Sequence, residues 1–222
     1  TQNVPGRNYS GIGTLNFNGV GGTGTKTYSM QGNIIANAIV LLGPNNNPGQ
    51  TAVDFLNTNN YNITATSLSV GRSGVNYWYG KLNAGYSTIT INGNVTIYAS
   101  DANGNNEINA GSSAWNITGN FNNNDIFTPG TSTVTLNGGS QTLTGTNSFY
   151  NLAKSTTTAD TLIFPASTTT TINGVLTLNG ASGQLLLLRS SSDGTPYTIA
   201  DLGTENINFA DVKDSTATNS II

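Results

Sequence analysis

Hydrophobic and polar residues alternate along most of the chain with a period of two. The clearest examples are residues 14–19, 88–93, 133–138, 170–174 and 176–180, where Leu, Val, Ile or Phe alternates with Thr or Asn. Successive side chains of a β-strand point to opposite faces, so each segment offers one apolar face and one face of hydroxyl and amide groups. Each segment ends in Asn-Gly, a dipeptide that accepts positive φ and bends the chain. The pattern predicts a strand followed by a turn, used many times.

The chain contains little that favours helix. Asn, Thr, Ser and Gly are poor helix formers, and no stretch of about a dozen residues combines an apolar stripe with capping residues. Residues 34–42 are apolar on every side and lie between Gly32 and Gly43, and residues 185–188 are four consecutive leucines. We expect both segments to be strands that are buried on both faces, or that lie at a seam between packed layers.

The spacing of the Asn-Gly turns indicates a repetitive fold. The Asn residues of these turns are Asn18, Asn92, Asn137, Asn173 and Asn179. A parallel β-helix or β-solenoid, with about 20 to 25 residues in each coil, would accommodate the chain in about nine to eleven coils. A β-sandwich or jelly roll with strand exchange is the alternative that the same alternation permits.

No segment has the composition of a linker. We therefore expect a single all-β domain over residues 1–222, with residues 1–20 as an N-terminal strand that subunits can exchange.

The composition removes several classes of function. The chain holds 34 Asn, 34 Thr, 20 Ser and 27 Gly among its 222 residues, and it has no His and no Cys. It therefore lacks an imidazole base, a thiol nucleophile, a disulfide and a zinc or haem site built on those residues. The net charge is −3 and the few Lys and Arg are scattered, so nucleic acid is not an expected partner. The longest apolar run is too short for a membrane-spanning helix.

The acidic residues offer little for catalysis. Asp211 and Asp214 flank Lys213, but no cluster of acids accompanies them in the sequence. General acid–base catalysis would need such a cluster, since the chain has no His. We do not expect an enzyme, and calcium is the one cofactor that the sequence suggests.

The composition also favours an exported protein. A chain without Cys and rich in Asn, Thr, Ser and Gly is typical of bacterial surface proteins, so we expect an extracellular, cell-surface location. The chain starts at Thr1 without a basic and apolar leader, which suggests that a signal peptide has been removed.

A series of short motifs begins at Trp115. They occupy residues 115–121, 131–138, 141–145, 148–152, 183–190 and 211–215. Their order resembles the repetitive β-helical cell-surface proteins of bacteria, which are similar in style to autotransporter passengers and filamentous adhesins. The resemblance covers the second half of the chain well and the first half only in texture. It implies a β-helical fold and an exported location, and that family carries no catalytic residues to transfer.

One acidic segment suggests a calcium site. Oxygen-bearing side chains stand at alternate positions, as in the first half of a calcium-binding loop. These are Asp101, Asn103, Asn105 and Glu107. The segment departs from that loop at its sixth position, where Asn106 replaces Gly, and at its twelfth, where Ser112 replaces Glu. A solvated turn between strands is the alternative.

The densest aromatic group is Tyr77, Trp78 and Tyr79. Aromatic faces stack on sugar rings, so these residues are candidates for contact with a glycan. In a strand that alternates, however, one face of the same group would belong to the core.

The scarcity of charge favours assembly. Exposed strand edges pair with other chains unless charge, Pro, a bulge or a cap prevents it. We expect a structural subunit of an extracellular filament or surface layer that assembles with itself, end to end, through strand edges. The residues expected to take part are Leu15, Phe17, Val20, Ile221 and Ile222. The alternative is an adhesin or glycan-binding surface module whose partners are glycans or other cell surfaces.

Overall fold

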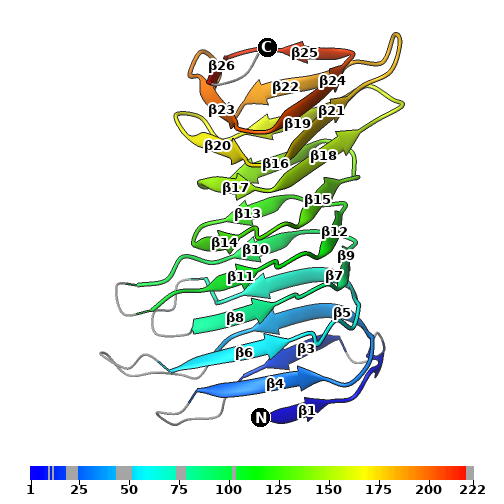
Figure 1. Cartoon of the computed structure of the whole chain (residues 1–222), viewed down its shortest axis with the longest axis vertical. Helices are drawn as coiled ribbons and strands as arrows, with labels where there is room; N and C mark the ends of the chain where they lie inside the picture. Colours follow the sequence, from blue (N-terminus) through cyan, green and yellow to red (C-terminus); the bar gives the residue numbers. More distant parts are fainter. Residues whose placement is uncertain are drawn as a thin grey trace.

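The computed structural model describes residues 1–9, 11, 13–18, 25–43, 52–73, 79–101 and 104–218. Within these residues the chain forms an all-β solenoid whose strands stack along one long axis (Figure 1). The predicted fold class is confirmed. The strands pair in parallel from coil to coil, which excludes the sandwich alternative.

Each coil contributes strands to three sides of the solenoid. Side 1 consists of a six-stranded sheet followed by a four-stranded sheet. Its strands are β1 (Gln2–Val4), β4 (Lys26–Met30), β6 (Val53–Asn57), β8 (Tyr79–Asn83), β11 (Glu107–Asn109), β14 (Ile126–Thr128), β17 (Asn147–Phe149), β20 (Thr169–Ile172), β23 (Tyr197–Asp201) and β26 (Ser215–Thr218).

Sides 2 and 3 share a 16-stranded sheet. Two long strands, β5 (Ile34–Leu41) and β7 (Ile63–Val70), run along both sides. The other strands of side 2 are β2 (Arg7–Asn8), β9 (Thr88–Ile91), β12 (Ala114–Ile117), β15 (Thr133–Leu136), β18 (Asn151–Ser155), β21 (Val175–Asn179) and β24 (Thr204–Asn208). The other strands of side 3 are β3 (Thr14–Phe17), β10 (Val95–Ile97), β13 (Phe121–Asn123), β16 (Gln141–Thr144), β19 (Asp160–Phe164), β22 (Leu186–Ser190) and β25 (Ala210–Val212).

The number of coils differs slightly from the expected nine to eleven. The described residues form about seven turns that have a separate strand on each side. In the second and third coils, β5 and β7 replace two strands each. The coils near the N-terminus are also longer than expected, since Ile34 pairs with Ile63, 29 residues further along the chain. Later coils are shorter, and Trp115 pairs with Val134 after only 19 residues.

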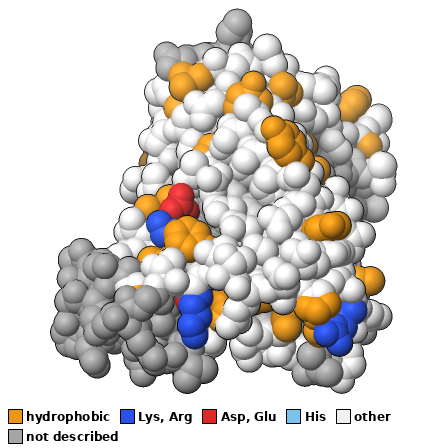
Figure 2. Space-filling view, turned by 60° about the horizontal axis from the view of Figure 1, so that its bottom comes forward, with side chains coloured by type: hydrophobic (Ala, Val, Ile, Leu, Met, Phe, Trp, Pro, Cys, Tyr) orange, Lys and Arg blue, Asp and Glu red, His pale blue; other side chains and the backbone are white. Residues whose placement is uncertain are grey.

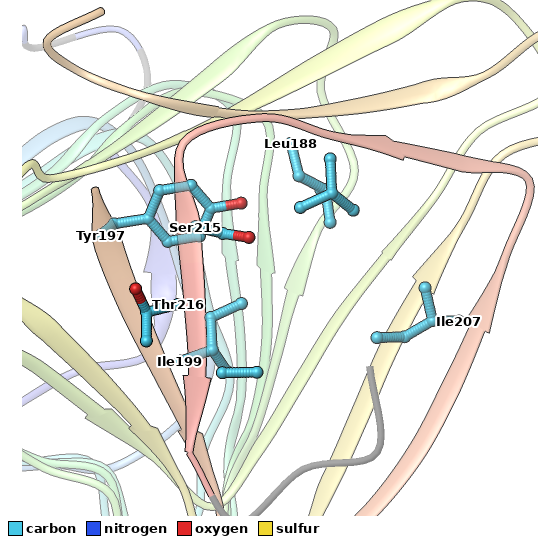
Figure 3. Close-up of a pocket in the computed structure, with 8 residues that line it drawn as sticks. Leu188, Tyr197, Ile199, Ile207, Ser215 and Thr216 are labelled. Carbon is cyan, nitrogen blue, oxygen red and sulfur yellow. The ribbon is translucent and has the colours of Figure 1, made fainter. Parts of the chain in front are cut away.

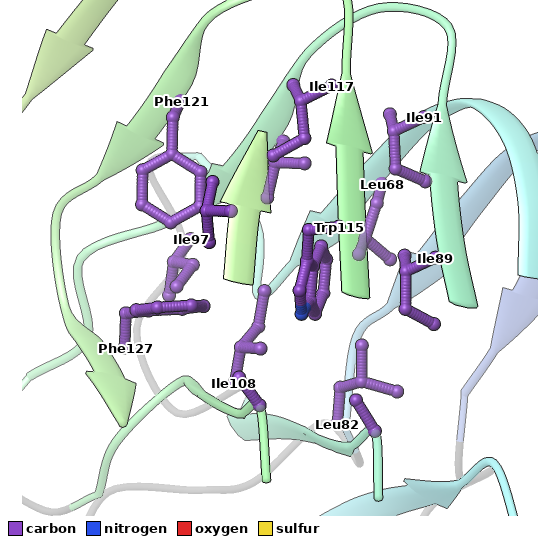
Figure 4. Close-up of a cluster of buried hydrophobic side chains, with 14 of the residues drawn as sticks. Leu68, Leu82, Ile89, Ile91, Ile97, Ile108, Trp115, Ile117, Phe121 and Phe127 are labelled. Carbon is purple, nitrogen blue, oxygen red and sulfur yellow. The ribbon is translucent and has the colours of Figure 1, made fainter. Parts of the chain in front are cut away.

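The core consists of side chains that stack directly above one another inside the solenoid. On side 2, Ile63, Ile89, Trp115 and Val134 occupy successive coils and are fully buried. Figure 4 shows Ile89 and Trp115 of this column, together with a group of aromatic rings that includes Phe121 and Phe127. In that group the ring of Phe127 meets that of Phe121 edge to face, with 5.1 Å between centroids. Burying one such side chain contributes about 1.5 to 3 kcal/mol, so the stack accounts for much of the folding free energy.

The two continuous apolar segments are strands, but the prediction that both faces are buried is wrong. Ile35 in β5 is 45% exposed, and Leu185, next to β22, is 40% exposed. A solenoid coil has one inner face only, so every second side chain points to solvent whatever its type.

Asparagine side chains bridge neighbouring coils at the corners. The Asn33 Oδ1 atom accepts a hydrogen bond from the Asn62 backbone amide at 2.8 Å, and the Asn62 Oδ1 atom accepts one from the Thr88 amide at 2.9 Å. The same relay joins Asn94 to Asn120 and Asn120 to Thr142, each at 2.8 Å. Strand pairing is interrupted at a corner, and a side-chain carbonyl there replaces the missing backbone acceptor. The abundance of Asn therefore has a structural cause.

The Asn-Gly turns require glycine for a different reason than the expected positive φ. The glycines with positive φ do not include Gly93, Gly138, Gly174 or Gly180. These glycines are needed because the coils approach each other closely: a Cβ atom at Gly138 would overlap the backbone oxygen of Thr118 in the preceding coil. Any larger residue would push the coils apart.

The described part of the chain contains no helix long and apolar enough to cross a membrane. The described strands of residues 1–20 pair within the same chain: β1 with β4, and β2 and β3 with β5. The first coil is therefore formed by the chain's own N-terminal strands, without exchange between subunits in this structure.

Candidate functional site

The described members of the predicted calcium set make other contacts. Asp101 accepts a hydrogen bond from the Tyr79 hydroxyl. The Glu107 carboxylate pairs with the Lys81 ammonium at 2.8 Å and also accepts from the Thr128 hydroxyl at 3.2 Å. Asn105 is exposed, and Asn103 lies outside the described residues. Among the described residues, no group of three or more acidic side chains could hold a metal ion.

Of the three aromatic candidates for glycan contact, only Tyr79 lies within the described residues. Tyr77 and Trp78 lie outside the described residues. Tyr79 is fully buried at the start of β8, and its hydroxyl points to Asp101. In β8 the Tyr79 side chain points to the opposite face from the inward-facing Leu82, and its ring is covered there by the segment at Gly104, so it has no exposed face for a sugar.

Two of the five residues expected to take part in assembly, Leu15 and Phe17, lie within the described residues. Val20, Ile221 and Ile222 lie outside the described residues. Phe17 is 3% exposed and meets the ring of Tyr28 edge to face at 5.2 Å, while Leu15 packs partly buried against the same core. Both side chains therefore pack inside the solenoid and are not exposed at its end. In the described structure, the groups that remain for assembly are the backbone edges of the end coils.

Those edges lie at the two ends of the stack. Among the described strands, β2 and β3 pair only with β5, and β1 pairs only with β4. At the other end, β24, β25 and β26 each have one hydrogen-bonded neighbour among the described strands. An edge of this kind presents a row of backbone groups that another strand can pair with.

Charge is distributed unevenly between the two ends. The first 53 residues contain Arg7 and Lys26 and no acid. Residues 186–218 contain five acids and two basic residues, a difference of three that equals the net charge of the chain. Arg189 contacts Asp211 at 3.1 Å, and Lys213 contacts both Asp193 and, at 3.9 Å, Asp214. Lys213 lowers the pKa of Asp193, and Asp193 raises the pKa of Lys213.

The inner column of side 2 ends in opposite charges. Arg7 pairs with Ile34 in the first coil, and Glu205 pairs with Leu176 in the last. Every paired residue between them in this column is apolar, from Ile34 through Ile63 to Leu176. The strand register places these two charges at equivalent positions, eight pairings apart along the stack.

A hollow of about 120 Å³ lies inside the last coils (Figure 3). Apolar side chains, including Leu188, Ile199 and Ile207, surround it, and the hydroxyls of Tyr197 and Ser215 lie side by side at its wall. Burial raises the pKa of Tyr197 to about 12, and the nearby Ser215 hydroxyl only partly opposes that effect. The hollow exists because small residues, Ser215 and Ala217, stack above Tyr197 and Ile199.

A second hollow, of about 380 Å³, is an open groove on the outside of side 3. It runs across the first four coils at the ends of β3, β5, β7 and β10. Its lining contains one aromatic residue, one cation, two aliphatic residues and small polar residues: Tyr98, Arg72, Val40, Leu42, Asn16, Ser69, Gly71 and Ser73. The sequence analysis missed this groove because residues from successive coils are 24 to 29 positions apart in the chain and come together only through the coil register.

Inside the solenoid the sequence analysis also missed a buried ion pair. The Lys154 ammonium lies 2.9 Å from the Asp160 carboxylate, and the two side chains are 1% and 6% exposed. Lys154 also donates to Gln141 Oε1 at 2.9 Å and to the backbone oxygens of Gly138 and Gly139 at 3.0 Å. A signal was present, since the alternation that turns Leu152 inward in β18 also turns Lys154 inward.

These features define a parallel β-solenoid with open end coils, a surface groove and no described acidic cluster suited to a metal. Comparison with protein-family models, with curated proteins and with solved structures found no match.

Proposed function

We propose that the protein is a structural subunit of an extracellular filament or surface layer, and that it is not an enzyme. Copies associate end to end through the strand edges of their end coils. The observation that supports this most directly is the pair of open edges, formed by β1 to β3 and by β24 to β26. Parallel strands at such an edge can extend the ladder with strands of a second copy.

Two further observations support the proposal. The ends carry opposite charge, with Arg7 at one and Glu205 at the other. Opposite charges favour a head-to-tail contact, which produces a filament when it does not close into a ring. The flanks carry little charge, and most of the face seen in Figure 2 is neither charged nor hydrophobic. Such flanks supply few groups that would keep copies apart at long range.

The test is to purify the 222-residue chain and to follow its size by light scattering and negative-stain microscopy. Deletion of residues 1–20 or of residues 216–222 should shorten or abolish the filaments. Unchanged filaments from both deletions would rule out assembly through the end coils.

A substitution can test the edge without removing a strand. The Lys213 amide donates to the Leu188 carbonyl of β22 at 3.1 Å, so in a parallel ladder the amide of Val212 in β25 faces the open edge. Val212→Pro removes that donor and should weaken assembly, whereas Val212→Ala keeps the donor and should assemble like the wild type. Arg7→Glu and Glu205→Arg should each weaken assembly at low salt, and the double variant should restore it. If the double variant assembles no better than the single ones, the head-to-tail charge contact is wrong.

The second candidate is an adhesin or glycan-binding surface module. The groove on side 3 favours it, because aromatic, cationic and small polar side chains line one open hollow there.

A further inference from the structure

The outer face of side 2 carries no charged side chain from β5 to β24. Side chains alternate along a strand, and the outward residues of these strands are all Thr, Asn, Ser, Ala, Val or Ile. The two charged residues of the same strands, Lys154 and Glu205, belong to inward columns. By contrast, the outer face of side 1 carries Lys81 and Glu107, and that of side 3 carries Arg189. A coil requires only that outward residues suit water, which charged residues would also do, so the neutrality of side 2 needs another explanation.

The outward side chains of side 2 form straight rows from coil to coil. The strand register carries the central row without a break from Ile35 in β5 to Asn206 in β24. Figure 1 shows these strands one above another along one flank of the solenoid. The row therefore repeats at the spacing of the strands, about 4.8 Å. Between its two ends the row contains, in order, Thr64, Thr90, Asn116, Thr135, Ala153 and Thr177.

Side chains of the neighbouring row are held in place by one another. The Asn151 amide group donates to the Thr133 hydroxyl at 3.0 Å and accepts from the Val175 backbone amide at 2.8 Å. Thr and Val are branched at Cβ, which leaves them few rotamers. A partner that covers this face would therefore immobilise few side chains, and the entropy cost of binding would be small.

We infer that a second copy of the chain covers this face, so that two solenoids pack side 2 against side 2. An identical copy presents the same rows at the same spacing, and the rows of both copies can interdigitate over all eight strands. A surface with a different repeat would fall out of step within a few strands. Paired sheets with matching rows of Asn and other small side chains form tight interfaces of this kind. No charge has to be removed from water when the two faces meet.

The size of the face suits a specific but modest contact. Eight strands span about 34 Å along the stack, and three outward positions per strand cover a width of about 15 to 20 Å. Each copy would bury about 600 Å² and the pair about 1,200 Å², which is the lower end of the range for stable interfaces. Two single chains should therefore associate reversibly, whereas many subunits held in one filament would associate firmly with a second filament.

The pairing of filaments rests on the proposed end-to-end assembly, but the contact between two single chains does not. Val212→Pro should weaken filament formation and still allow the side-by-side dimer. Filaments that never pair, from a chain that is monomeric when single, would overturn this inference and leave the proposed function standing. Dimers from a chain that never forms filaments would do the reverse.

The experiment measures the dimer dissociation constant by sedimentation velocity and the width of the filaments by negative-stain microscopy. Thr90→Lys combined with Thr135→Lys places like charges on both faces of the contact. We expect this double variant to raise the dissociation constant at least tenfold and to give single filaments in place of paired ones. Thr171→Lys is the matched control, because Thr171 points outward from β20 on side 1 and its substitution should change neither measurement.

A distance measurement keeps the test decisive if far-UV circular dichroism shows that the double lysine variant is unfolded. The chain has no native Cys, so a nitroxide label can be placed on Thr135→Cys or on Thr171→Cys alone. Thr135 lies near the middle of the eight strands, so two labels there should be closer together in the dimer than two labels at Thr171. Equal dissociation constants for the wild type and the folded double lysine variant would overturn the inference, as would labels at Thr135 that are no closer than those at Thr171.

Discussion

Replacing Asp160 with Asn removes the charge that faces Lys154 while keeping the size of the side chain. The Lys154 ammonium is 1% exposed and would retain only neutral acceptors, namely Gln141 and the backbone oxygens of Gly138 and Gly139. Removing one partner of a buried ion pair costs about 3 to 5 kcal/mol, since the remaining charge is left uncompensated. For a chain of this length that loss lowers the melting temperature by about 6 to 20 °C.

A double-mutant cycle separates the pair from its surroundings. Lys154 pairs with Leu178 in the next coil, so Lys154→Met continues an apolar column and should by itself leave an uncompensated carboxylate. The double variant Lys154→Met with Asp160→Asn leaves no charged group of the pair in the interior. We expect its loss of stability to be less than half the sum of the two single losses.

Urea unfolding followed by far-UV circular dichroism measures these differences, and hydrogen exchange in β18 and β19 shows whether the damage is local. Stacked coils can unfold in parts, so both readouts are needed. Asp193→Asn is the control, because its partner Lys213 is exposed and the melting temperature should hardly move. The reasoning would be refuted by a loss below about 1 kcal/mol for Asp160→Asn, or by strictly additive single effects.

Three further predictions concern the corners and the core. Stability should fall as the pH rises from about 10 to 12, because the buried Tyr197 stays neutral in the fold while its unfolded counterpart, with a pKa of 10.0, ionises; titrated urea curves should show a smaller fall for Tyr197→Phe. Asn120→Ala should cost about 1 kcal/mol in urea unfolding, since the amide of Thr142 loses its acceptor, and an equal effect of Asn116→Ala on the outer face of β12 would contradict a special role for corner asparagines. Gly138→Ala should cost about 1 to 3 kcal/mol, because its methyl group would overlap the preceding coil; an alanine at the next residue, where nothing lies within 4 Å, should be tolerated, and equal melting temperatures for the two variants would count against the close approach.

The strands themselves could be predicted from the alternation. The segments at 14–19, 88–93 and 133–138 correspond to β3, β9 and β15, and in each the Leu, Val, Ile or Phe side chains turn inward while Thr and Asn turn outward. The period of two is a local property of the backbone, so a short window of sequence contains it. The solenoid class was predicted because the same strand-turn unit recurs along the chain, and the β-sandwich stayed open as the alternative.

The coil register could not be predicted in the same way. Coil length varies from 18 residues between Val134 and Leu152 to 29 between Ile34 and Ile63. The variation arises at the corners, where loops of different length return the chain to the same column, and loop length has only a slow effect on stability. Without the register, no reading of the sequence could place Tyr98 beside Gly71 or Arg7 and Glu205 in one column.

Most Asn, Thr and Ser residues are explained by the fold, and this narrows where function can be sought. Outward Thr and Asn suit a pleated surface, and corner Asn residues complete the hydrogen bonding between coils. Residues that fit the repeat in this way would be required of a solenoid with any function. The absence of charge from the outer face of side 2 goes beyond what the repeat requires, and two departures from the repeat are also informative: a lysine turned inward, and charges at the two ends of an apolar column. Each departure gives up some of the stability that the repeat would supply, so each is where a binding or assembly role should be tested first.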